Sequence, residues 1–147
     1  MSPAARDSYF ENEVLTATPQ KLHLMLIEAA IRLANQTIEH WREGRETQAA
    51  EAIVRCQRIL AEMFKGLRPD LMPDLISKVA KVYNFMHRST VEAQIQRDPQ
   101  RLTEVVRVLE IERETWRQVC EQLASNRPKN GSIPSPHSAV GRLSLEA

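Results

Sequence analysis

The segment ETQAAEAIVRCQRILAEMFKGL, residues 46–67, has the most regular pattern of the chain. Its apolar residues recur at alternating steps of four and three positions. Because an α-helix completes a turn in 3.6 residues, this spacing places them on one helix face, as in the seam between packed helices. The seam consists of Ala49, Ile53, Cys56, Leu60, Met63 and Leu67. The segment therefore predicts an amphipathic helix in an all-α protein.

Start and stop signals place further helices on both sides of this segment. Thr18-Pro19 and Asp98-Pro99 each join a side chain that can cap a helix to a proline at the first helical position. Gly44 and Gly66 fall where helices should end, and Pro73 follows a break in the pattern. The predicted helices cover residues 19–42, 46–67, 73–97 and 99–124. Their similar lengths and short connections predict an antiparallel up-and-down four-helix bundle.

The apolar seams of the other helices differ in width. Two stripes on helix 19–42 predict that it is the most enclosed helix. On helix 73–97 the pattern gives a narrow seam and leaves Tyr83 on a second face; this seam is Leu75, Val79, Val82 and Met86. The seam of helix 99–124 is Leu102, Val105, Leu109, Glu112, Trp116, Val119 and Leu123. Glu112 thus occupies an apolar position, where it needs a wet edge, a hydrogen-bond donor or a cation such as Arg88.

The two ends of the chain lie outside the periodic region, which leaves one bundle domain at residues 19–124. Residues 1–18 form a short N-terminal segment whose apolar side chains need cover, including Tyr9, Val14 and Leu15. Two alternatives stay open for it: a lid that cargo displaces, or a segment docked permanently on the core. Residues 125–147 are rich in Ser, Pro and Gly with few apolar residues, which predicts a flexible, disordered tail.

Composition argues against several classes of protein. The 147 residues include 20 Lys and Arg against 19 Asp and Glu, so no charge excess attracts nucleic acid or an anionic membrane. No apolar run is long enough to span a bilayer. The two cysteines, Cys56 and Cys120, lie in helical segments and form no disulfide framework. These features predict a cytoplasmic protein that binds neither nucleic acid nor membrane.

The sequence contains no recognisable catalytic constellation. None of the four histidines, at positions 23, 40, 87 and 137, follows a glutamate at the Glu-x-x-His spacing of bundle metal sites. The glycines are isolated, so no glycine-rich loop can hold phosphates, and there is no Gly-x-Ser-x-Gly turn. Cys56 lies on a helix seam, which favours a small buried side chain over a nucleophile. We therefore expect no enzyme activity, no metal and no cofactor.

Ordered motifs across residues 9–124 resemble those of FliS-type flagellar secretion chaperones. The matching segments are Tyr9, Val14, Thr16 to Pro19, Leu22-x-x-Met25-Leu26, Tyr83-x-Phe85-Met86, Val91-Glu92-Ala93, Leu102-x-Glu104-Val105 and Arg113-x-x-Trp116. The chain departs from the family pattern at Ile27, Ala29, Thr90 and Glu112. These departures leave the bundle intact but bear on groove shape, and so on which cargo is bound.

The resemblance implies a chaperone that is a monomer without cargo. Such a protein holds the disordered C-terminal segment of flagellin in an extended apolar groove, prevents premature polymerisation and aids export, with the flagellar export gate as a further partner. The candidate cargo-binding residues are Tyr9, Val14, Leu15, Ile27, Ile31, Tyr83, Val108 and Ile111. One alternative is a helical adaptor that binds another folded protein through the same surface. A more distant alternative is a metal- or redox-active bundle.

Overall fold

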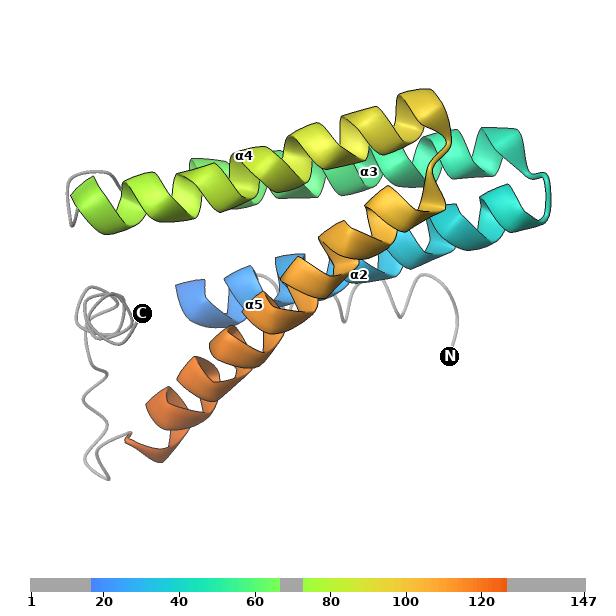
Figure 1. Cartoon of the computed structure of the whole chain (residues 1–147). Helices are drawn as coiled ribbons and strands as arrows, with labels where there is room; N and C mark the ends of the chain where they lie inside the picture. The colour runs from blue at the N-terminus through green and yellow to red at the C-terminus, as the bar shows by residue number, and fades with distance from the viewer. Residues whose placement is uncertain (1–16, 67–72, 127–147) are drawn as a thin grey trace, which may run out of the picture.

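A computed structural model describes residues 17–66 and 73–126 of the chain, with the side chains of 73–76 left out (Figure 1). Four helices account for nearly all of this part: α2 (Pro19–Arg42), α3 (Glu46–Lys65), α4 (Pro73–Gln96) and α5 (Pro99–Ser125). Their ends lie within two residues of the predicted ranges. None of the described helices is both long and apolar enough to cross a bilayer.

The helix ends are fixed by the residues that the sequence marks. The Thr18 hydroxyl accepts a hydrogen bond from the backbone N–H of Lys21, and the Asp98 carboxylate accepts from those of Gln100 and Arg101. Each cap satisfies backbone donors that a helix leaves free in its first turn. Gly44 has a φ of +74° in the α2–α3 turn, a conformation that glycine adopts without steric cost.

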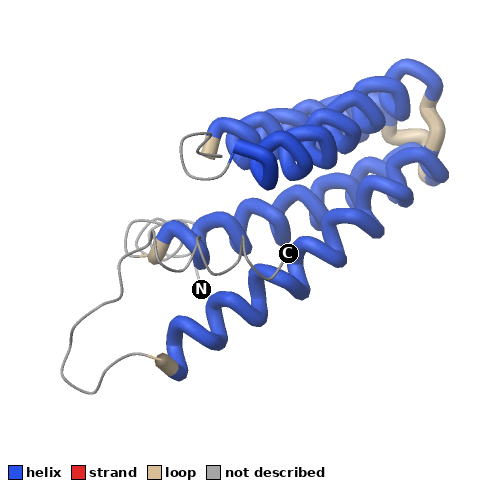
Figure 2. The backbone as a smooth tube through the Cα atoms, turned by 60° about the vertical axis from the view of Figure 1, so that its left-hand side comes forward, coloured by secondary structure: helices blue, strands red, loops and turns tan. Residues whose placement is uncertain are grey.

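The four helices form an up-and-down bundle. Each helix packs against its neighbours in sequence, and α5 returns to pack against α2, which closes the ring. In Figure 1 the α3–α4 pair lies above the α2–α5 pair. The two pairs are joined closely at the end that holds the α4–α5 turn, and their ribbons separate toward the opposite end in both views (Figures 1 and 2).

The core confirms most of the predicted seams. On α3 the whole described seam is buried, namely Ala49, Ile53, Cys56, Leu60 and Met63. Helix α2 buries residues of both stripes, including Ile27 and Leu33, because it packs against α3 and against α5, while Leu22, Leu26 and Ala29 are half-buried. On α5 the buried seam residues include Leu102, Val105, Leu109 and Val119.

The predicted seam of α4 is wrong at Val82, whereas Val79 and Met86 pack in the core as predicted. Tyr83 is 2% exposed and belongs to the core, whereas Val82 is 37% exposed. The seam runs through Val79, Tyr83, Met86, Thr90 and Ala93. Two of its members are polar, and they can be buried because each hydroxyl has a partner: Thr90 donates to the His87 carbonyl at 2.7 Å, and Tyr83 bonds to His23.

Candidate functional site

An ion pair marks the register in which α4 and α5 lie beside each other. Arg101 on α5 pairs with Glu92 on α4. Side chains seven residues apart share one face of a helix, because seven residues make nearly two full turns. Phe85 precedes Glu92 by seven positions and Val108 follows Arg101 by seven. Since the two helices are antiparallel, this register places Phe85 and Val108 at the same level on α4 and α5.

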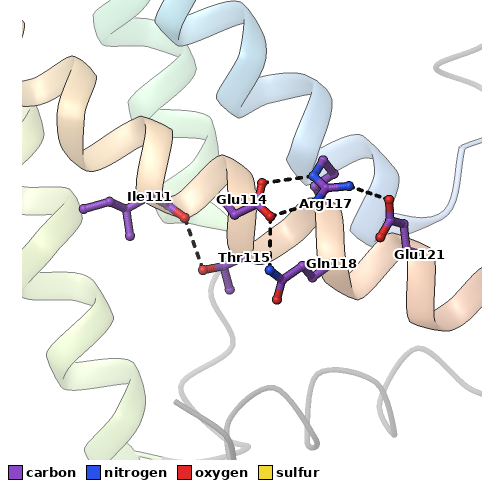
Figure 3. Close-up of polar contacts among 6 residues, drawn as sticks. All are labelled: Ile111, Glu114, Thr115, Arg117, Gln118 and Glu121. Atoms are coloured by element: carbon purple, nitrogen blue, oxygen red, sulfur yellow. Dashed lines mark hydrogen bonds and ion pairs between the residues drawn. The ribbon is translucent and has the colours of Figure 1, made fainter.

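One turn further from the ion pair lie Val82 on α4 and Ile111 on α5, so the register groups four apolar residues. We name them the α4–α5 strip: Val82, Phe85, Val108 and Ile111. Phe85 is 50% exposed and Ile111 is 68% exposed, while Val108 is half-buried against the core. Figure 3 shows the Ile111 side chain projecting from α5 away from the ion pairs on the same helix. Exposed apolar side chains grouped on one side of a protein are typical of a surface that binds another chain.

A polar cluster joins three helices close to the strip, since two of its members, Tyr83 and Glu112, adjoin strip residues in the chain. The Tyr83 hydroxyl of α4 lies 2.9 Å from the His23 Nε2 of α2. The His23 ring also packs against the Trp116 ring of α5, with ring centroids 4.3 Å apart. Glu112 lies one turn before Trp116, and its carboxylate accepts a hydrogen bond from the Trp116 indole N–H. We name His23, Tyr83, Glu112 and Trp116 the His23 cluster.

Burial sets the protonation states within the His23 cluster. It lowers the pKa of His23 to about 4, so the imidazole is neutral at neutral pH. Burial and, to a smaller degree, the Glu112 charge raise the pKa of Tyr83, so its hydroxyl keeps its proton and can donate to an unprotonated Nε2. Burial raises the pKa of Glu112, and the indole N–H opposes that shift. The donor that Glu112 needs is thus Trp116 of the same helix, whereas Arg88 is exposed.

The structure separates the predicted cargo-binding residues into three groups. Val108 and Ile111 belong to the α4–α5 strip, and Ile27, Ile31 and Tyr83 are buried in the bundle. The remaining three lie outside the described residues, namely Tyr9, Val14 and Leu15. Binding of cargo by any of the eight stays a prediction.

Sequence reasoning missed Val82 and Phe85 as surface residues. The apolar pattern predicts Val82 on the core seam, and the sequence identifies Phe85 only as part of a motif shared with the family. The signal was present in the chain, because a seam through Tyr83 and Met86 turns both of these neighbours outward. That seam also contains Thr90, a polar residue, so apolar periodicity alone does not favour it.

Cys56 is fully buried. Its thiol donates toward the Ala30 carbonyl at 3.5 Å, and burial raises the pKa of Cys56 to about 12. A thiol in this environment stays protonated and serves as a small core side chain. Within residues 17–66 and 73–126, no three His, Cys, Asp or Glu side chains gather closely enough to hold a metal ion.

Known proteins resemble this chain along almost its whole length. The family model described as "Flagellar protein FliS" matches residues 1–123. The flagellar secretion chaperone FliS of Bacillus subtilis (strain 168) is 32% identical over 129 residues, which cover 86% of this chain and 93% of that protein. The chain therefore belongs to the FliS family of flagellar secretion chaperones.

Proposed function

We propose that this protein is a cytoplasmic chaperone that holds the C-terminal segment of flagellin on the α4–α5 strip until export. The observation that supports the proposal most strongly is the strip itself, where Phe85 and Ile111 stay exposed in a member of a chaperone family. A chaperone that releases its client to an export system needs a surface that is available before the client arrives. The export gate is then the second partner, which receives the loaded complex.

In this mechanism the flagellin segment is disordered alone and orders as an amphipathic helix on binding. Its apolar side chains at i, i+3, i+4 and i+7 lie on the strip. Ordering a flexible segment costs conformational entropy, so a stable complex must bury a large apolar area. Residues 82 to 85 and 108 to 111 each cover about one helical turn, so we expect the cargo to continue over neighbouring surfaces. While the segment is held, it is unavailable for polymerisation.

The other candidate residues take different roles in this proposal. Ile27, Ile31 and Tyr83 are buried, so they reach cargo only if part of the bundle opens. Residues 1–16 and 127–147 lie outside the described part of the chain, and for residues 1–18 a lid that cargo displaces and a permanently docked segment both stay open. Hydrogen exchange over residues 7–17, with and without the flagellin segment, tests the lid: strong protection that cargo leaves unchanged means permanent docking.

The test of the proposed site is the affinity of the purified protein for the C-terminal segment of its own organism's flagellin. We expect Ile111→Asp to weaken binding by at least about ten-fold, or about 1.4 kcal/mol, because a carboxylate on the strip must be desolvated on binding. The matched control is Ile95→Asp, since Ile95 is 77% exposed on α4 and lies outside the strip. Both variants should melt like the wild type.

Two outcomes would contradict the proposal. If both variants bind the segment as the wild type does, the strip is not the docking surface. If the wild type does not bind the segment at all but retains a folded flagellar protein from the same cells, the helical adaptor is the better description.

A further inference from the structure

The exposed face of α4 beside the strip carries cations without carboxylates. Lys78, Lys81, Phe85 and Arg88 follow each other at steps of three, four and three, so they form one stripe along the helix. All four are exposed. No Asp or Glu occurs on α4 from residue 77 to residue 91. Within the described part of the chain, Lys78, Lys81 and Arg88 form no ion pair.

The opposite edge of the strip, on α5, carries charges of both signs. The exposed charges within one turn of Val108 or Ile111 are two arginines and three glutamates: Arg107, Arg113, Glu104, Glu110 and Glu114. Glu114 is also engaged within its own helix, where it accepts hydrogen bonds from Arg117 at 2.7 Å and from Gln118 at 3.1 Å (Figure 3). The hydrogen bond from Arg117 lowers the pKa of Glu114 to about 2, so this carboxylate stays ionised and compensated.

We name Lys78, Lys81 and Arg88 the cation row of α4. We infer that this row makes the strip selective for a helix whose apolar stripe is flanked on one side by carboxylates. This inference rests on the proposed function, because it assumes that the strip is a docking surface for an amphipathic helix. Exposed ion pairs contribute little affinity one by one, but complementary charge steers encounter and disfavours partners of the wrong sign. The row therefore determines which helices are accepted, while the apolar strip supplies most of the binding.

Two synthetic peptides of about five helical turns test the selectivity. Both carry the same leucine stripe at i, i+3, i+4 and i+7; one has glutamates along one flank, and the other has lysines at the same positions. We expect the wild-type protein to bind the glutamate peptide about ten-fold more tightly at low salt. The preference should shrink in about 1 M salt, where the screening length falls to about 3 Å.

The matched variants reverse three cations each and change the net charge equally. Lys78→Glu, Lys81→Glu and Arg88→Glu together should invert the preference toward the lysine peptide. The control reverses three exposed arginines away from the strip, Arg32, Arg55 and Arg58, and should keep the wild-type preference. Thermal melting followed by circular dichroism confirms that both triple variants are folded.

Three other outcomes would each contradict a different part of the inference. If the wild type binds both peptides equally and Ile111→Asp abolishes both, the strip is a docking surface without charge selection. A preference that survives in the α4 triple variant also overturns the inference, because the selecting charges then lie elsewhere. If Ile111→Asp changes the affinity for neither peptide nor the flagellin segment, the proposed docking site itself is wrong.

Discussion

His23 is neutral in the folded protein because it is enclosed between Tyr83 and Trp116. Its folded-state pKa of about 4 lies below the ordinary histidine value of 6.5, so the unfolded chain binds a proton more readily. Stability is therefore unaffected by this group above about pH 6.5 and falls as the pH drops toward 4. Glu112, whose pKa is raised, acts in the opposite sense, since its unfavourable ionisation is relieved in acid.

This linkage gives a prediction for His23→Gln. Between pH 7 and pH 5 the wild type should lose about 2 kcal/mol through His23 alone, because the two pKa values span most of that interval. Glutamine does not titrate, so the variant should lose that much less over the same interval. Urea unfolding at both pH values measures the difference. Equal losses in wild type and variant would show that His23 does not control the acid response.

Glu112 gives a second prediction at this scale. Glu112→Leu should raise the free energy of unfolding by about 1 kcal/mol, because a half-buried carboxylate is replaced by an apolar side chain on an apolar seam. The Trp116 indole is half-buried and can turn to water. Thermal melting and affinity for the flagellin segment are measured together. Weaker binding without a loss of stability would instead make Glu112 a cargo contact.

At the scale of single helices, core and strip should separate by mutation. Leu60→Ala in α3 should cost about 2 to 5 kcal/mol of unfolding free energy, since Leu60 is fully enclosed. Ile111→Ala in α5 should cost less than about 1 kcal/mol, because the side chain is mostly exposed without cargo. Val82→Ala should resemble Ile111→Ala. Denaturant unfolding of the three variants checks this, and a Val82 cost equal to that of Leu60 would return Val82 to the core.

The helices differ in how much of their packing the sequence reveals. The ends of α2 and α5 were predictable because a capping side chain and a proline meet at Thr18-Pro19 and Asp98-Pro99. The α3 seam was predictable because its described members are all apolar or small. The α4 seam was not, because Tyr83 is buried only with a partner from α2, sixty residues earlier. The strip was missed for the same reason, since it depends on how α4 and α5 pack together, a register that the ion pair between Glu92 and Arg101 marks.

At the scale of the whole molecule, the side-chain hydrogen bonds and ion pairs between helices are unevenly distributed. Three of those in the described part gather near the α4–α5 turn: Gln57 with Gln94, Glu46 with Arg97, and Glu92 with Arg101. Farther from that turn, the His23–Tyr83 bond connects α4 to α2. The closely joined end thus holds the register of α4 and α5, and the strip begins two helical turns beyond the Glu92–Arg101 pair.

The most direct measurement is NMR of methyl-labelled protein, titrated with the C-terminal segment of flagellin. Val82, Val108 and Ile111 report on the strip, while Ile53 and Ile95 report on the core and on a distant exposed site. If the segment docks on the strip, the first three methyl groups should shift most, in proportion to bound peptide, and Ile95 should stay unchanged. Saturated binding that leaves the Val82, Val108 and Ile111 signals in place would contradict docking on the α4–α5 strip.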